Sequence, residues 1–316
     1  MKTLRETIRN LTNQHLDTGH LVMGQCLTAV GWVGGTLPER QDMTELPMSD
    51  VAGAGFAVGA ALMGRRPIYV VRYQGFCWLN ASMVVNYAAK SKALWGRPCP
   101  ILIRSIAMEG GIGPVAGSSH HSLFLRMPGV KIFSPMTPGE WRSAYEEFMA
   151  GDDVVYLSEH RKAYDQSDET PPWRIDRLGF ATEGSPVPDV VIFPISITRF
   201  AAVEAAKELF NETNPIIASV HHIFQLKPFK PSQEALNDLK VAYYGGIVID
   251  DDYPDGTAKA LALDLHNLTG ARMYVLGLED RTAGFSPQTD NLPPDKIRIK
   301  QFVQGIIKGK TETRWD

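Results

Sequence analysis

The chain has 316 residues, 44% hydrophobic and 21% charged, which is an ordinary globular composition with room for two domains. Its formal net charge of −3 gives no reason to expect nucleic acid or an acidic membrane surface as a partner. The three cysteines are too scattered for a disulfide framework, and no signal peptide or membrane-spanning run is visible, so we expect a cytoplasmic protein.

The first half of the chain alternates helical and strand patterns. A T-x-x-E capping box at Thr3 and Glu6 predicts an opening helix, and the β-branched run over 68–73 predicts a buried strand. Further strands are expected over 21–23, 100–104, 130–133 and 154–157, and further helices over 76–94 and 138–149. This alternation is typical of a parallel sheet covered on both faces.

The second half repeats the alternation. A polar segment rich in proline and aspartate predicts a linker over 166–187. Strands are then expected over 190–193, 216–220, 246–249 and 273–276, with helices over 201–210, 232–239, 257–268 and 295–308. The predicted fold class is therefore α/β with two doubly wound domains, one over 1–165 and one over 188–316.

The stretch around Asp50 organises the first domain. Ser49 and Asp50 precede a run of small apolar residues over 51–61, and its three glycines indicate a helix packed closely against its neighbours. Asp50 could be a first-turn acid of this helix or a buried acid of an active site. The spacing G-x-G-x-x-x-G departs from the dinucleotide fingerprint, and no nucleotide P-loop motif occurs.

His120 and His121 are the best candidates for functional histidines. They lie in a glycine- and serine-rich loop over 109–122 that follows a predicted strand. Loops at the ends of parallel strands are where ligands bind, although exposed loop polarity is the alternative. No H-E-x-x-H or paired-cysteine motif occurs, so we expect no metal ligands from this chain.

Three other polar or aromatic groups favour plainer interpretations. His221 and His222 follow a buried strand, where structural or interface roles are expected. The acidic run over 250–252 is expected to be solvated or to lead into a helix. Phe76 and Trp78 begin a predicted helix, and core packing is the first interpretation of both.

Several motifs then place the chain beside a known family. They are Pro47-Met48-Ser49-Asp50, Gly64-Arg65-Arg66-Pro67-Ile68, Phe76 and Asn86-Tyr87-Ala88-Ala89-Lys90, in that order without a gap. This segment resembles the β chains of pyruvate-dehydrogenase-type 2-oxo acid decarboxylases and, more distantly, the C-terminal half of transketolase. Similar runs over 128–135 and 251–254 extend the resemblance over nearly the whole chain.

The resemblance implies a thiamine diphosphate enzyme. In the family the acid at the position of Asp50 hydrogen-bonds a pyrimidine nitrogen of the cofactor and favours the tautomer that makes its carbanion nucleophile. The resemblance also places Phe76 in a stack on the pyrimidine, and Ser49 and Gln25 beside the cofactor. His120 or His121 would contact the substrate carbonyl or the intermediate derived from the carbanion.

The chain also departs from this family. Asp50 stands where the family has glutamate, and Gln25 stands where the β chains usually carry glutamate. Only five residues separate Ser122 from Pro128, which shortens the connection after the histidine loop. The Gly-Asp-Gly motif that holds Mg²⁺ and the diphosphate is absent, so these ligands are expected from a separate alpha-type chain in an α₂β₂ heterotetramer.

The expected function is that of the β-type subunit of such a two-chain enzyme, which breaks or forms a carbon–carbon bond next to a carbonyl. The first expectation is 2-oxo acid decarboxylation with transfer of a two-carbon acyl unit. The alternatives are a split transketolase C-terminal subunit that transfers a ketol unit between sugars, and a non-catalytic scaffold or regulatory homologue.

Overall fold

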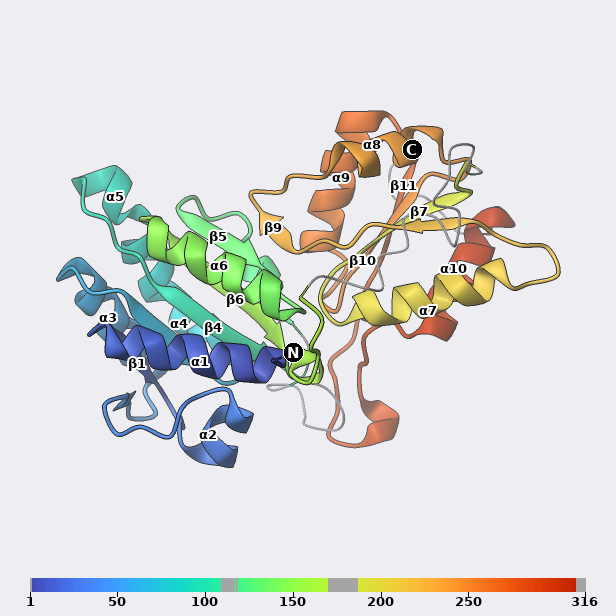
Figure 1. The fold of residues 1–316 in the computed structure, drawn as a ribbon. Helices are drawn as coiled ribbons and strands as arrows, with labels where there is room; N and C mark the ends of the chain where they lie inside the picture. The colour runs from blue at the N-terminus through green and yellow to red at the C-terminus, as the bar shows by residue number, and fades with distance from the viewer. Residues whose placement is uncertain (1, 109–116, 118, 170–186, 311–316) are drawn as a thin grey trace. The chain divides into compact units, whose positions relative to one another are not determined.

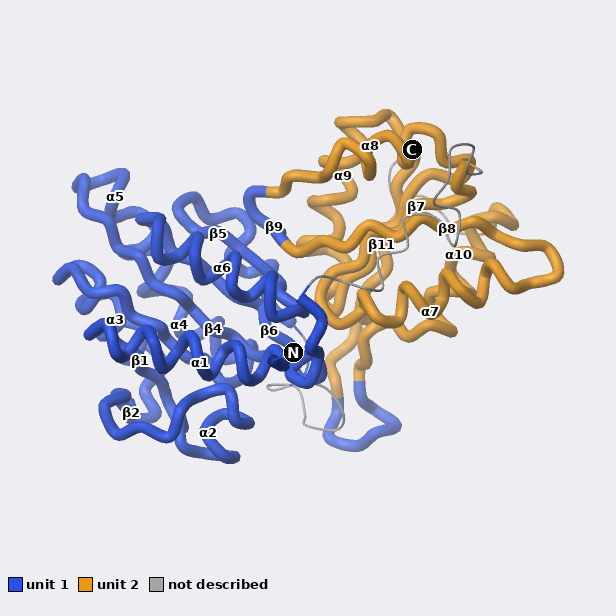
Figure 2. Tube along the Cα trace, in the orientation of Figure 1, with its two compact units in different colours: residues 1–170, 225–228, 284–290 blue, residues 171–224, 229–283, 291–316 orange. Residues whose placement is uncertain are grey.

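The computed structural model describes residues 2–108, 117, 119–169 and 187–310, and its chain forms two compact units (Figure 2). Unit 1 contains residues 1–170, 225–228 and 284–290, and unit 2 contains residues 171–224, 229–283 and 291–316. The glycine loop over 109–116 and most of the predicted linker lie outside the described residues.

Unit 1 is built on a seven-stranded sheet with the strand order β2-β1-β3-β4-β6-β5-β9. All neighbours in it are parallel except β5 and β9, which pair antiparallel. The strands are β1 (Leu21–Gly24), β2 (Thr44–Glu45), β3 (Pro67–Val71), β4 (Leu102–Ala107), β5 (Val130–Phe133), β6 (Val154–His160) and β9 (Gln225–Lys227). β4 begins two residues later than predicted; Pro100 has no N–H to offer a strand ladder.

The helices of unit 1 cover both faces of this sheet (Figure 1). They are α1 (Leu4–Asp17), α2 (Ala29–Gly35), α3 (Asp50–Leu62), α4 (Cys77–Met83), α5 (Ala89–Trp95) and α6 (Pro138–Ala150), with a π-helical turn over Val84–Ala88. The predicted helix over 76–94 is therefore interrupted by this turn. The capping box that opens α1 is confirmed, because the Thr3 and Glu6 side chains each bond the other's backbone N–H.

Neighbouring residues of β4 show how the two faces are filled. Arg104 forms an ion pair with Glu159 beneath Trp141 of α6, whereas the next residue, Ser105, contacts Cys77 of α4. Successive side chains of a strand point to opposite faces, so α6 and α4 lie on opposite sides of the sheet. Every residue of β4 and β6 is buried, as expected for strands covered twice.

Residues of α2 carry an unusual backbone. From Val30 to Gly34 every φ is positive, including those of Val30 (53°), Trp32 (55°) and Val33 (52°). This left-handed conformation costs a residue with a Cβ about 1–2 kcal/mol. The segment that follows β1 is thus a strained left-handed turn.

Unit 2 has a four-stranded parallel sheet with the order β11-β10-β7-β8. Its strands are β7 (Val190–Pro194), β8 (Ala218–Val220), β10 (Gly246–Ile249) and β11 (Met273–Leu276), and its helices are α7 (Thr198–Phe210), α8 (Gln233–Val241), α9 (Thr257–Thr269) and α10 (Lys296–Ile307). One apolar core joins α7 and α10 to one face of the sheet. Two α/β units with parallel sheets confirm the predicted fold class.

Within the described residues, no helix is both long enough and apolar enough to traverse a bilayer.

Candidate functional site

The predicted site residues of unit 1 follow the carboxyl ends of its parallel strands. Gln25 comes directly after β1, Phe76 lies five residues beyond the end of β3, and His120 and His121 lie between β4 and β5. The carboxyl ends of parallel strands meet at one edge of a sheet, where α/β proteins bind their ligands. The strand order thus gathers residues that are far apart in the sequence.

A pocket of about 130 Å³ opens at this edge. Three of the predicted site residues, Asp50, Phe76 and Gln25, share its wall; its lining is Gln25, Cys26, Met48, Asp50, Tyr69, Val70, Val71, Arg72, Tyr73, Phe76 and Asn80. An apolar cavity of about 150 Å³ holds a benzene molecule, so this open pocket is close to the size of one six-membered ring. Ser49, His120 and His121 do not line it.

Asp50 is the first residue of α3, where a carboxylate interacts favourably with the helix dipole. Ser49 is the N-cap residue, but its side chain makes no capping hydrogen bond. Asp50 is half-buried rather than buried, because its side chain faces the open pocket. Asn80 Nδ2 donates a hydrogen bond to Asp50 Oδ1 at 3.3 Å, so both predicted interpretations, first-turn acid and pocket acid, fit one geometry.

The small residues of α3 let the helix approach β3 closely. A Cβ on Gly53 would lie 2.9 Å from the hydroxyl oxygen of Tyr69, closer than real Cβ contacts allow. That hydroxyl donates a 2.6 Å hydrogen bond to Asn80 Oδ1. Gly53 therefore leaves space for the phenol of Tyr69, which hydrogen-bonds Asn80, the partner of Asp50.

Gln25 and Phe76 give the pocket polar and aromatic walls. The buried Nε2 of Gln25 has no hydrogen-bond partner among the described residues. Burying such a donor unpaired costs about 1–3 kcal/mol, so a ligand acceptor at this position would be stabilising. Phe76 is half-buried, and its ring centre lies 5.9 Å from that of Tyr73. A carboxylate, an unpaired amide donor and an aromatic face fit a flat heteroaromatic ring.

A buried glutamine supports the histidine segment. Gln74 Oε1 accepts hydrogen bonds from the backbone N–H of His120 (2.7 Å) and from Tyr156 (3.2 Å). Its Nε2 donates to Ser158 Oγ at 2.9 Å, and Ser158 Oγ lies 3.1 Å from Nδ1 of His121. Gln74 thus fixes the main chain of His120 directly and the ring of His121 through Ser158.

The two histidines have different surroundings. His121 is buried and opens a 3₁₀ turn over His121–Phe124. His120 is half-buried, and its Nδ1 accepts a hydrogen bond from Trp78 Nε1 at 3.4 Å. An accepting Nδ1 leaves the proton of a neutral ring on Nε2, so His120 is suited to donate a hydrogen bond.

Cys77 has no nucleophilic character despite its place beside Phe76. Its thiol is buried against Ser105 Oγ at 3.0 Å. Burial, opposed only in part by hydrogen bonds from Ser105 and Tyr156, raises the pKa of Cys77 to about 11. The thiol therefore stays protonated near neutral pH.

Unit 2 holds a separate buried polar cluster. His221 Nε2 lies 3.0 Å from Asp238 Oδ2, Ser219 Oγ donates to the same oxygen at 2.6 Å, and Phe193 stacks on the imidazole. This closed arrangement ties α8 to β8 and agrees with the structural interpretation of His221. Its partner in the sequence, His222, is half-buried.

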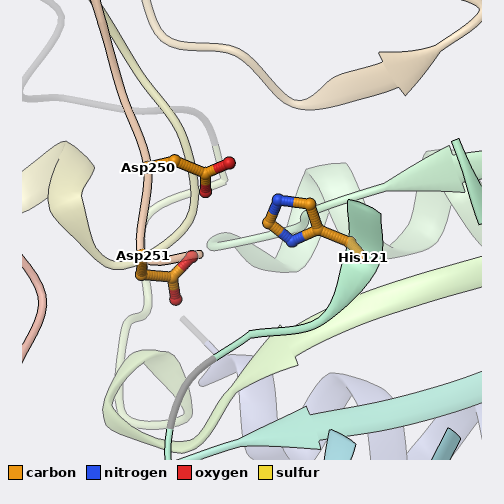
Figure 3. A group of neighbouring side chains, drawn as sticks. All are labelled: His121, Asp250 and Asp251. Atoms are coloured by element: carbon orange, nitrogen blue, oxygen red, sulfur yellow. The ribbon is translucent and has the colours of Figure 1, made fainter. Parts of the chain in front are cut away.

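The acidic run over 250–252 was expected to be solvated or to lead into a helix. It is not solvated, and α9 begins five residues after it. Asp250, Asp251 and Asp252 are all buried directly after β10, and Figure 3 labels the first two together with His121 of unit 1. Asp251 accepts a 2.7 Å hydrogen bond from the hydroxyl of Ser196, and Asp252 accepts one from its neighbour's N–H. Hydrogen bonds within unit 2 replace part of the hydration that these carboxylates lose.

Sequence reasoning missed Asn80, Tyr69 and Gln74. Asn80 follows Phe76 by four residues, so it lies on the same helical side as the predicted aromatic wall. Tyr69 brings a hydroxyl into the apolar strand pattern over 68–73, and Gln74 ends that pattern with an amide. Such polar positions within buried elements were the available signal.

Comparisons with known proteins show what the chain is similar to. Residues 15–166 match the family model described as the transketolase pyrimidine-binding domain. The 2-oxoisovalerate dehydrogenase β subunit of Bacillus subtilis (strain 168) is 27% identical over 69% of this chain and 67% of its own length. The pyruvate dehydrogenase E1 component β subunit of Chaetosphaeridium globosum is 27% identical over 96% of both chains.

A solved structure shows the same fold. The inactive β4 tetramer of a split gene transketolase covers 98% of this chain and 99% of its own, with a TM-score of 0.71 at 16% identity. This likeness shows the fold of the whole chain. Residues 15–166 belong to the family of transketolase pyrimidine-binding domains, and the chain as a whole is similar to the β subunits of 2-oxo acid dehydrogenases.

Proposed function

We propose that the chain is the β-type subunit of a two-chain thiamine diphosphate enzyme that decarboxylates a 2-oxo acid and transfers the remaining acyl unit. The observation that carries the proposal is the pocket in which Asp50, Phe76 and Gln25 meet. Relatives that are β subunits of 2-oxo acid dehydrogenases support it.

The pocket residues would hold the pyrimidine half of the cofactor. Asp50 would hydrogen-bond a ring nitrogen, Phe76 would offer its face to the ring, and Gln25 Nε2 would donate to a further acceptor. The cofactor, when bound, supplies the carbon nucleophile that this reaction class requires. Asp50 is in reach of the pocket from a helix end that is fixed by packing, which keeps its carboxylate in one place.

His120 and His121 are proposed to act on the substrate. The Nε2–H of His120 would donate to a developing oxyanion, a kind of interaction that is strongest in the transition state. His121, which is buried beside Ser158, would hold or accept a proton through its ring. Neither histidine lines the cofactor pocket, in keeping with a substrate-binding rather than a cofactor-binding task.

A partner chain would complete the site. The printed sequence contains no Gly-Asp-Gly, so we propose that an alpha-type chain supplies the ligands for Mg²⁺ and the diphosphate in an α₂β₂ assembly. The exposed apolar residues of the neighbouring helices α3 and α4 support a partner: Phe56 is 59% exposed and Trp78 is 60% exposed. Large exposed apolar side chains are typical of protein interfaces.

Residues 1–165 are accordingly proposed as the pyrimidine-binding domain, 166–187 as the linker and 188–316 as a transketolase C-terminal-like domain. A second candidate function, ketol transfer by a split transketolase, is favoured by the structural likeness over 98% of the chain. The histidine pair and the neutral Gln25 suit such a sugar substrate.

One experiment tests the function and separates the candidates. The full chain is purified with the alpha-type chain that it binds, loaded with thiamine diphosphate and Mg²⁺, and supplied with 2-oxo acids or ketose phosphates. We expect turnover of a 2-oxo acid; turnover of ketose phosphates alone would establish the second candidate. A complex that binds no thiamine diphosphate would refute both.

A further inference from the structure

We propose that Asn80, oriented by Tyr69, is a positioning residue for the Asp50 carboxylate. The inference deepens the proposed function and rests on it, because Asp50 is the acid assigned to the cofactor. No motif in the sequence points to this pair. The two residues come from different elements: Tyr69 lies in β3 and Asn80 in α4.

The hydrogen bonds of Asn80 permit only one orientation of its amide. Its Nδ2 donates to Asp50 Oδ1 at 3.3 Å and to the backbone oxygen of Phe76 at 2.9 Å. Its Oδ1 accepts from the Tyr69 hydroxyl at 2.6 Å. A flipped amide would place its oxygen against two acceptors, one of them a carboxylate, so the flip is strongly disfavoured.

Burial makes this arrangement rigid. Asn80 and Tyr69 are each 2% exposed, and the Tyr69 hydroxyl packs against Gly53 at the start of α3. Burial, together with the nearby charge of Asp50, raises the pKa of Tyr69 well above its ordinary value. The phenol thus keeps its proton near neutral pH and remains the donor to Asn80.

The hydrogen bond from Asn80 fixes one oxygen of the Asp50 carboxylate, and this also sets the direction of the other oxygen. Oδ1 accepts from Asn80, whereas Oδ2 has no hydrogen bond to any described residue of the chain. Aspartate is shorter than the glutamate of the family, and a misplacement of about 1 Å can cost on the order of 100-fold in rate. The hydrogen bond from Asn80 fixes the position of the shorter Asp50 side chain. Oδ2 can then form a hydrogen bond with the ring nitrogen of a ligand.

The first arm of the test needs neither cofactor nor partner. Urea unfolding of the full chain is measured for Asp50→Ala, Asn80→Ala and the double variant. We expect a coupling of about fivefold in the unfolding equilibrium constant. Additive effects would show that the two side chains do not interact and would overturn the proposal, whatever the function.

The second arm uses the cofactor-loaded complex. Tyr69→Phe keeps the ring and removes only the hydroxyl, and we expect kcat to fall about tenfold while the substrate KM changes by less than about twofold. Asn80→Ala should lower kcat at least as much. The matched exposed changes Tyr243→Phe and Asn237→Ala in unit 2 should leave both constants unchanged.

The outcomes separate the inference from the function beneath it. An active complex whose kcat is the same with Tyr69→Phe and Asn80→Ala would overturn the positioning role. A complex that binds no thiamine diphosphate would refute the proposed function instead, and the coupling in the first arm would still report whether Asn80 holds Asp50.

Discussion

Replacing Gln74 by methionine should destabilise unit 1 by about 3 kcal/mol. The two side chains have similar length, so the change removes the amide and little volume. Gln74 is fully buried, and its amide contacts the His120 N–H, the Tyr156 hydroxyl, the Ser158 hydroxyl and two backbone oxygens.

The magnitude follows from the groups left behind. The His120 N–H at 2.7 Å and the Ser158 hydroxyl at 2.9 Å make the shortest bonds to this amide. Each buried group left unsatisfied costs about 1–3 kcal/mol, and the costs of neighbours are not additive. We therefore expect a combined loss of about 3 kcal/mol, a large fraction of the roughly 5–15 kcal/mol that is typical of a domain.

Two measurements check this estimate. Urea unfolding followed by circular dichroism gives the change in free energy, and amide hydrogen exchange reports the His120 N–H directly. Gln301→Met, on the exposed side of α10, is the matched control and should change the free energy by less than about 0.5 kcal/mol. A loss below about 1 kcal/mol for Gln74→Met with unchanged His120 exchange would refute the supporting network.

Three further changes have definite expected outcomes. Arg104→Met should cost about 3–5 kcal/mol in urea unfolding, because it strands the buried Glu159 carboxylate; equal stability would contradict the ion pair. Phe56→Glu should prevent co-purification with the partner chain and leave the unfolding free energy of the isolated chain unchanged; an intact complex would place the interface elsewhere. Burial lowers the pKa of His15 to about 4, below the unfolded value of about 6.5. The contribution of His15 to the free energy of unfolding is therefore complete above about pH 6.5 and is lost as the pH falls toward about 4. His15→Gln should flatten the fall of the unfolding free energy over this pH range. An unchanged pH dependence in the variant would contradict this role of His15.

The fold was accessible from the sequence because its signals are local. Strand runs such as 190–193 and 246–249 and the Thr3–Glu6 capping box depend on neighbouring residues, and the structure confirms them. The π-helical turn at 84–88 and strand β9 were not predicted, since the first breaks a continuous helical pattern and the second pairs with β5 far away in the sequence.

The same difference between local and distant signals decides which parts of the site could be predicted. Asp50, Gln25 and Phe76 were named from motifs and do share one pocket, whereas their tasks toward a cofactor stay predictions. Asn80 and Gln74 were missed because their importance comes from partners 30 and 46 residues away, Asp50 and His120. The burial of Asp250–Asp252 was also missed, since a triple-acid run is usually solvated and only the folded chain supplies Ser196 as a donor.

The proposed role of Asp50 is to activate a bound cofactor. Hydrogen–deuterium exchange at the thiazolium carbon of thiamine diphosphate, followed by NMR in the complex with the partner chain, measures this activation. We expect fast exchange in the wild-type complex and exchange at least about 100-fold slower with Asp50→Ala, while the variant chain keeps its circular dichroism spectrum. Equally fast exchange in the Asp50→Ala complex would show that Asp50 does not activate the cofactor and would leave it as a first-turn acid of α3.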